Sequence, residues 1–141
     1  MLFRSHCAAI SLALARGRSG EVYNVGGNSE TTNIEIVRML CALVDERLSQ
    51  DAGLRSAFPE SPASSGGRAA DLITHVRDRP GHDRRYAIDY GKAQRELGYA
   101  PARDLTTGLR ATLEWYLSHE AWWRALLGRD YAEWVEKNYR R

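Results

Sequence analysis

The sequence predicts a small mixed fold, of the α+β or α/β class, with about five helices and two or three short strands. Three observations predict it. Apolar residues recur at helical spacing in several windows of the chain. Two short segments, residues 21–25 and 72–76, are rich in β-prone residues and end at turn signals. Of the 141 residues, 43% are hydrophobic, which suits a single globular core.

The charge balance and the two cysteines narrow the class of protein. The formal net charge is only +2 with acids and bases interleaved, so we expect no nucleic-acid partner. No apolar run is long enough to span a membrane and no signal-peptide pattern is visible, so we expect a cytoplasmic protein without a membrane partner. Cys7 and Cys41 lack metal-ligand spacing. We expect both to be buried small hydrophobic residues in a reducing compartment rather than a disulfide.

The first elements follow from periodicity. Residues 6–16 have a helical pattern that stops at Gly17 and Gly20. This helix follows the chain start directly, so we expect the chain to begin inside a longer protein and residues 1–5 to be non-native. Residues 21–25 alternate and then break at a glycine pair, which predicts a strand that leads into a loop.

The second helix is predicted to begin near Thr32, because Thr32 and Glu35 have capping-box spacing. Its apolar face consists of Val37, Leu40, Cys41, Val44 and Leu48. Residues 49–70 then turn to Ser, Ala, Gly and Pro without periodicity. Such a stretch is long for a structureless loop, so we expect either a surface insertion or a partly disordered segment.

The remaining elements are a second strand over residues 72–76 and three helical segments. Asp89 can cap a helix that Gly98 closes. Asp104 or Thr106 opens a long amphipathic helix, and the sequence leaves both open. Residues 119–141 are helical in pattern and rich in aromatic residues, which we expect to pack rather than to stack on bases.

The most informative segment is residues 78–89. It places four donors around a Pro-Gly turn, namely Arg79, His82, Arg84 and Arg85. Guanidinium groups fit phosphate oxygens two at a time, so a diphosphate is the obvious ligand. The alternative is a solvated turn on which Asp78, Asp83 and Asp89 simply neutralise the arginines. Residue types alone do not decide between the two.

Several catalytic motifs are missing from the sequence. It contains no G-x-G-x-x-G after a strand, no P-loop, no zinc ligand set and no nucleophile elbow. No Tyr is followed by Lys four positions later in a plausible active-site helix. We therefore predict no catalytic, cofactor-binding or metal-binding residue in this chain.

Residues 20–139 resemble the C-terminal half of the dTDP-glucose 4,6-dehydratases, a family of the extended short-chain dehydrogenase/reductase superfamily. The matching pieces are GEVYNVGG (20–27), TNIEIV (32–37), DRPGHDRRYAID (78–89), KAQRELGYAP (92–101), EWYL (114–117) and NY (138–139). The element at 92–101 identifies only the superfamily, whereas the run at 78–89 is more particular to the 4,6-dehydratases. The resemblance implies that residues 6–141 form a nucleotide-sugar-binding lobe of a Rossmann-type enzyme.

The resemblance also implies site residues. Asn33 resembles a nucleotide-binding asparagine at a helix start, and Tyr139 resembles an aromatic residue that closes over the nucleotide. A plain helix cap and core packing, respectively, are the alternatives from residue type alone. The substrate-binding turn corresponds to Asp78, Arg79, Pro80, Gly81 and His82. Within it, Arg79 is the expected phosphate fork.

What the resemblance implies for function is a lobe that grips a dTDP-sugar, while an N-terminal Rossmann domain, absent here, holds NAD and converts dTDP-glucose to dTDP-4-keto-6-deoxyglucose. The lobe alone is expected to bind no NAD and to be inactive, and the full-length enzyme is expected to be a homodimer through the absent half. The alternatives are a related nucleotide-sugar epimerase or decarboxylase lobe, and a stand-alone nucleotide-binding module.

Overall fold

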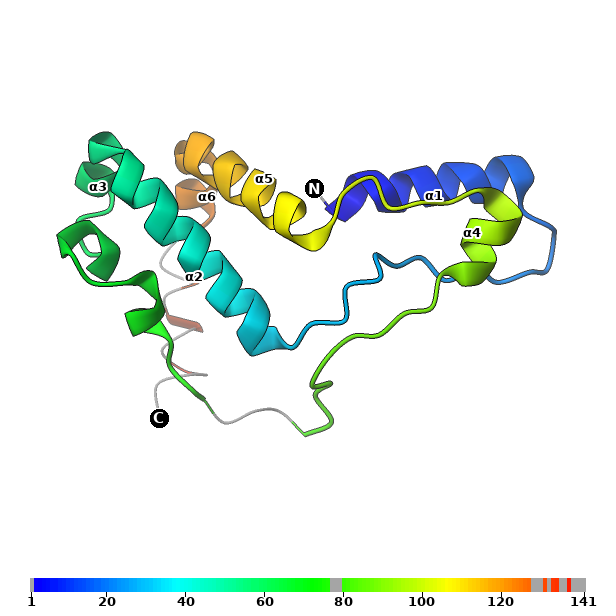
Figure 1. Ribbon diagram of the computed structural model, residues 1–141, viewed down its shortest axis with the longest axis horizontal. Helices are drawn as coiled ribbons and strands as arrows, with labels where there is room; N and C mark the ends of the chain where they lie inside the picture. Colours follow the sequence, from blue (N-terminus) through cyan, green and yellow to red (C-terminus); the bar gives the residue numbers. More distant parts are fainter. Residues whose placement is uncertain (1, 77–79, 128–130, 132, 135–136, 138–141) are drawn as a thin grey trace.

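The computed structural model describes residues 2–76, 80–127, 131, 133, 134 and 137. Within these residues the regular structure is helical (Figure 1). The α-helices are α1 (Leu2–Arg16), α2 (Asn33–Gln50), α3 (Ala52–Ala57), α4 (Gly91–Leu97), α5 (Leu105–Ser118) and α6 (Glu120–Leu126). Two 3-10 helices, η1 (Pro62–Ser65) and η2 (Ala69–Leu72), lie between α3 and α4. No helix in this part of the chain has the length and apolar character needed to cross a membrane.

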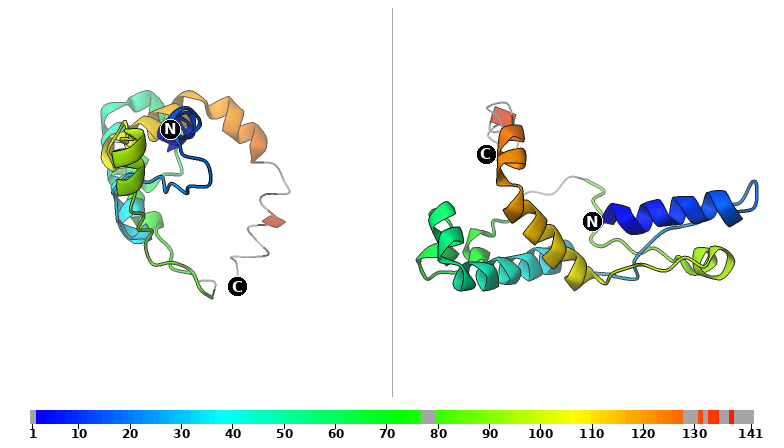
Figure 2. Two further views of the ribbon diagram at one scale, coloured as in Figure 1. Left: turned by 90° about the vertical axis from the view of Figure 1, so that its right-hand side faces the viewer. Right: turned by 90° about the horizontal axis from the view of Figure 1, so that it is seen from above.

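The helices form two groups. Helices α1 and α4 pack together at one end of the molecule, and α2 packs with α3, η1, η2 and α5 at the other (Figures 1 and 2). Extended segments connect the groups, among them residues 20–32 and 98–104. One further tie is a hydrogen bond of 3.2 Å from the Ala102 amide to the Ser5 hydroxyl of α1.

The α1–α4 group has a small apolar core of Ala9, Ala93, Leu97 and Tyr99, each at most 2% exposed. Helix α4 ends at Gly98, whose φ of 73° lies in the left-handed region that closes helices. The chain then turns back and buries Tyr99, whose ring meets that of Tyr90 edge to face. The sequence predicted both this helix and its glycine stop.

The α2 group is held by apolar and charged contacts. Leu43 and Leu48 of α2 and Ala69 of η2 are buried. The Asp45 carboxylate accepts a hydrogen bond of 2.7 Å from the Ala69 amide, which ties η2 to α2. Helix α5 is joined to α2 by further ion pairs, including a two-bond pair between Arg110 and Glu46 at 2.8 and 2.9 Å.

The two predicted strands are not formed in the described residues. Residues 21–25 and 73–76 are extended but belong to no ladder, and Leu72 ends η2 instead of starting a strand. Within the described residues, the β-type pairing is limited to an isolated antiparallel bridge between Thr32 and Arg85. A strand needs a neighbour in register, and residues 21–23 meet the side chains of α4 rather than another backbone.

Residues 49–70, predicted to lack regular structure, contain three short helical elements. Local side-chain bonds explain them: Asp51 caps α3 by accepting from the Leu54 amide at 3.1 Å. The Ser64 hydroxyl donates to the Phe58 carbonyl at 2.7 Å, and Gly66 ends η1 with φ of 92°. Small polar residues therefore cap turns here rather than leaving a loop.

The predicted helix starts and the predicted burial of the cysteines agree with the structure only in part. The first helix begins at Leu2, ahead of the predicted residue 6. Asp104 caps α5 and so decides between the two predicted starts. Both cysteines are free, as predicted, but Cys7 is exposed and Cys41 only half-buried, so their predicted burial is wrong. Cys7 lies on a face of α1 that no described element covers.

Candidate functional site

The N-terminal end of α2 is shaped by a local capping arrangement. Thr32 is the N-cap in extended conformation, and its amide and hydroxyl both donate to the Glu35 carboxylate, at 2.8 and 2.6 Å. These bonds lower the pKa of Glu35, mainly through the Thr32 hydroxyl. The first helical residue, Asn33, is exposed beside this cap. The cap therefore fixes the position of Asn33, and its hydrogen bonds join Thr32 and Glu35 rather than the Asn33 side chain.

The second part of the site is the turn at residues 80–85. Pro80 and Gly81 form the bend, and Gly81 has φ of 74°, a left-handed conformation that glycine adopts without strain. A Cβ added at Gly81 would meet no atom within 4 Å, so only the backbone angle requires glycine here. His82 follows and is half-buried.

The two parts meet, although Thr32 and Arg85 are 53 positions apart in sequence. The backbone of Arg85 forms the antiparallel bridge with Thr32, one residue before Asn33. The Arg85 guanidinium forms an ion pair with Glu30. The structure thus brings Asn33 and the Pro-Gly turn to adjoining backbone segments, and basic side chains of the turn lie near the α2 cap.

The predicted site residues are not all described. Asn33, Pro80, Gly81 and His82 lie in the arrangement above. Asp78, Arg79 and Tyr139 lie outside the described residues. Their predicted roles therefore stay predictions.

Glu30 was not predicted as part of the site. The sequence offers only a general hint, namely that an acidic residue can pair with one of the arginines elsewhere in the chain. Nothing local in the sequence pairs position 30 with position 85, however, and the bond depends on the long-range fold.

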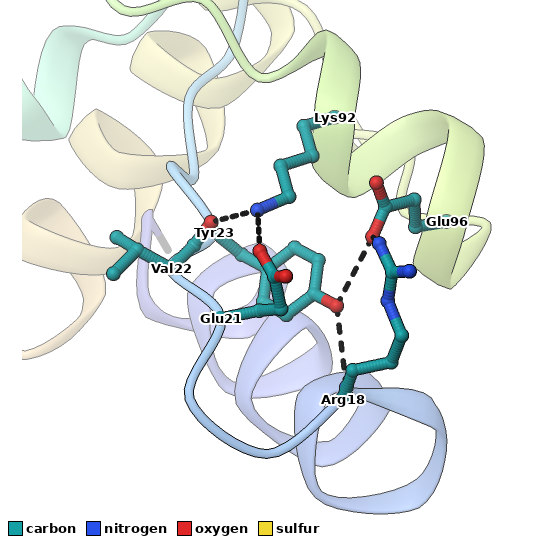
Figure 3. Close-up of polar contacts among 6 residues, drawn as sticks. All are labelled: Arg18, Glu21, Val22, Tyr23, Lys92 and Glu96. Atoms are coloured by element: carbon teal, nitrogen blue, oxygen red, sulfur yellow. Dashed lines mark hydrogen bonds and ion pairs between the residues drawn. The ribbon is translucent and has the colours of Figure 1, made fainter.

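A second polar cluster holds the loop after α1 against α4 (Figure 3). The Lys92 ammonium donates to the Glu21 carboxylate at 2.6 Å and to the Val22 carbonyl at 3.0 Å. This contact raises the pKa of Lys92 and lowers that of Glu21, chiefly through their mutual hydrogen bond.

The same cluster has a second layer. The Glu96 carboxylate accepts from the Arg18 guanidinium at 3.0 Å and from the Tyr23 hydroxyl at 3.2 Å. The Lys92 ammonium also lies 4.8 Å from the centre of the Tyr23 ring. Every charge named here has an opposite partner, so the cluster positions the loop and offers no unpaired group for chemistry.

An apolar cleft of about 470 Å³ lies between α3, α5 and α6. Its lining is Phe58, Tyr116, Leu117, Trp122, Trp123, Leu126 and Leu127. A diphosphate needs charged or amide donors, which this lining largely lacks, so the cleft is a poor nucleotide site. The aromatic residues of 119–141 were predicted to pack, but Trp122, Tyr131 and Trp134 are each more than half exposed, and only Trp123 is half-buried among the described ones.

The side chains that could ligate a metal are dispersed in the described part of the chain. Among the described residues, no three His, Cys, Asp or Glu side chains cluster closely enough to hold a metal ion. The sequence has no glycine-rich dinucleotide loop after a strand.

Comparison with known proteins shows the family to which this chain belongs. The sequence model of the GDP-mannose 4,6 dehydratase family matches residues 2–112, so the chain belongs to that family. Among relatives, the dTDP-glucose 4,6-dehydratase of Salmonella typhimurium is 39% identical over 134 residues, which are 95% of this chain and 33% of the relative. The enzyme of the same name from Xanthomonas campestris pv. campestris is 44% identical over 126 residues, 89% of this chain and 32% of the relative.

A solved structure agrees. The crystal structure of dTDP-glucose 4,6-dehydratase from Bacillus anthracis in complex with NAD superimposes with a TM-score of 0.66 at 37% identity. The match covers 87% of this chain and 32% of that one. The chain thus spans about a third of the length of the proteins it matches. The resemblance to dTDP-glucose 4,6-dehydratases deduced from residues 20–139 is confirmed.

Proposed function

We propose that this chain binds the nucleoside diphosphate part of a sugar nucleotide, as the substrate-binding lobe of a dTDP-glucose 4,6-dehydratase. The observation that carries the proposal is the meeting of the α2 start with the Pro80–Arg85 turn through the Thr32–Arg85 bridge. Family membership and two relatives of that name support the choice of substrate class.

The chemistry of the residues supports an anionic ligand. The start of an 18-residue helix carries partial positive charge and favours a nearby anion. The adjoining turn adds guanidinium groups, which bind phosphate oxygens in pairs. In this proposal Arg79 holds the phosphates with Asp78 and His82 beside it, Asn33 donates to the nucleotide, and Tyr139 covers the base.

The lobe contributes binding and orientation rather than bond breaking. Binding energy from a remote part of a substrate can hold the reacting sugar in place for chemistry elsewhere. In the full-length enzyme that we propose, NAD and the catalytic groups belong to other residues. We propose that this chain alone does not dehydrate dTDP-glucose.

The experiment is a calorimetric titration of the 141-residue chain with thymidine diphosphate. Arg79→Ala is expected to weaken binding about tenfold or more, because a charge-assisted bond to phosphate is lost. Arg103→Ala, which removes an exposed arginine before α5, is the matched control and should leave affinity unchanged. Equal affinity of Arg79→Ala and the unsubstituted chain would contradict the proposal.

A second candidate differs only in the nucleotide. The family model is named for GDP-mannose, which favours a guanosine diphosphate as the competing ligand. Competition among thymidine, uridine and guanosine diphosphates decides between them. Preference for thymidine supports the dTDP-sugar, whereas preference for guanosine or uridine selects a related sugar-nucleotide enzyme.

Catalysis is tested with a chimaera in which this chain replaces the matching third of the Salmonella typhimurium relative. Formation of dehydrated dTDP-sugar, followed by mass spectrometry, is expected from the chimaera and not from the chain alone. Turnover by the chain alone would overturn the proposed division of labour.

A further inference from the structure

We propose that Glu30 and Arg85 are positioning residues for the nucleotide. Their ion pair fastens the Pro80–Arg85 turn to the N-terminal end of α2 and so fixes the distance between the turn and Asn33. The inference rests on the proposed function, because it names what organises that same site. We call this pair, with the Thr32–Arg85 bridge, the clasp.

The neighbouring residues Arg84 and Arg85 of the turn make different contacts. Arg85 is engaged twice, by its backbone with Thr32 and by its guanidinium with Glu30. Arg84 forms no ion pair within 4.0 Å with a described residue, although its charge acts on the Glu35 carboxylate and helps to lower the pKa of Glu35. A guanidinium already matched by a carboxylate is a weaker phosphate ligand than a free one. Arg85 is therefore the structural member of the pair.

The clasp matters because, among the described residues, the polar contacts given between residues 30–32 and the turn are the bridge and this ion pair, while Gly26 lies against Ile88 further along. The bridge is isolated, so no ladder of backbone bonds holds the turn in register with residues 30–32. The glycine in the bend adds freedom at the tip of the turn. A binding site shared by two loosely joined segments must be ordered when the ligand arrives, and that ordering reduces affinity. The clasp holds the turn beside residues 30–32 before the ligand binds, which reduces the ordering that binding requires.

The expected effect is modest, since both side chains are 52% exposed. An exposed ion pair contributes little free energy, so its removal should weaken nucleotide binding by only about two- to fivefold. The direction of the effect is more informative than its size. If Arg85 instead held phosphate directly, removing the competing Glu30 charge would strengthen binding.

The test is titration with thymidine diphosphate of Glu30→Gln, Arg85→Gln, and the exchanged pair Glu30→Arg with Arg85→Glu. Each single variant should bind about two- to fivefold more weakly, and the exchanged pair should recover most of that loss. Tighter binding by Glu30→Gln, or weaker binding by the exchanged pair than by either single variant, would overturn the clasp.

The matched control is the pair Glu46 and Arg110, whose side chains are 42% and 45% exposed and which joins α2 to α5. Glu46→Gln and Arg110→Gln remove a comparable ion pair from the same helix and should leave the affinity unchanged. An equal loss in these variants would assign the effect to general stability, and the clasp would be rejected.

Hydrogen exchange without ligand separates this inference from the proposed function. Amides of residues 80–90 should exchange faster in Glu30→Gln than in the unsubstituted chain, while those of α4 should not change. Unaltered exchange at 80–90 overturns the clasp, whatever the binding results. If the unsubstituted chain binds no nucleoside diphosphate but the exchange responds, the proposed function fails and the clasp remains as a structural contact only.

Discussion

The hydroxyl of Tyr99 donates a hydrogen bond of 3.0 Å to the backbone carbonyl of Gly26, 73 residues earlier in the chain. Tyr99 is 2% exposed, and burial raises the pKa of its phenol. The bond fastens the loop after α1 to the segment that leaves α4. That loop continues through residues 27–32 to the start of α2, so the bond anchors one approach to the candidate site.

Replacing Tyr99 with Phe should remove this bond and keep the packed ring. We expect a loss of about 0.5–1.5 kcal/mol in the free energy of unfolding, because the Gly26 carbonyl loses its partner. Urea denaturation measures the change. Tyr116→Phe is the control, since the Tyr116 ring is exposed and no hydrogen bond of its hydroxyl is described. Equal destabilisation by both variants would argue against a role for the bond.

Burial in the α1–α4 core predicts a contrast between two leucines. Leu97 is 1% exposed, whereas Leu14 of α1 is 85% exposed. Leu97→Ala should cost about 2–5 kcal/mol through lost contacts and a cavity, and Leu14→Ala should change stability by no more than about 0.5 kcal/mol. Thermal unfolding followed by circular dichroism compares them. A comparable loss of stability in both variants would mean that the face of α1 carrying Leu14 is buried, contrary to the structure.

Two glycines in helical regions should respond oppositely to alanine. Gly98 has φ of 73°, and an added Cβ would lie 3.2 Å from Arg16 Nη1. Gly98→Ala should therefore destabilise the protein by about 1–2 kcal/mol. Gly108 lies inside α5 with open space around an added Cβ, so Gly108→Ala should stabilise by about 0.5–1 kcal/mol. Urea midpoints test both, and a shared sign would refute the assignment.

Acid should weaken the protein partly through the cap of α5. The Asp104 carboxylate accepts from the Thr107 amide at 2.9 Å and from its hydroxyl at 2.7 Å, and the amide bond chiefly lowers the pKa of Asp104. Because the folded pKa lies below the unfolded one, the stabilisation is complete above the unfolded pKa and is lost as the pH falls through the folded pKa.

Asp104→Asn keeps an N-cap side chain but cannot titrate. Between about pH 5 and pH 2, its urea midpoint should fall less steeply than that of the unsubstituted chain. Glu35→Gln should show the same trend, because the pKa of Glu35 is also lowered. Parallel acid profiles in all three proteins would show that neither carboxylate contributes.

Local signals predicted most of the helical structure. The Thr32–Glu35 spacing, the glycine at position 98 and the aspartate at position 104 each mark a helix end that the structure contains. Such signals work because capping bonds join residues only three or four apart. The prediction of a strand at residues 21–25 was wrong because a strand needs a distant partner strand. Local alternation of apolar and polar residues does not specify that partner.

The site was predictable only in outline. Residue chemistry singled out the arginine-rich turn, and the resemblance added Asn33. That the two adjoin follows from a bridge between residues 53 positions apart, which no local pattern contains. Glu30 was missed because its partner Arg85 lies 55 positions away in sequence. Cys7 was placed in a core because its apolar neighbours suggested one, yet α1 leaves that side exposed.

Helix α2 carries Asn33 at one end and the contacts with α5 and η2 toward the other. Its 18 residues make an axis about 27 Å long. A tilt of about 2° around its far end would therefore displace Asn33 by roughly 1 Å, a shift large enough to disturb a ligand's alignment. Substitution of Asp45, whose carboxylate ties η2 to α2 far from Asn33, can therefore change nucleotide binding by tilting α2 as a rigid body.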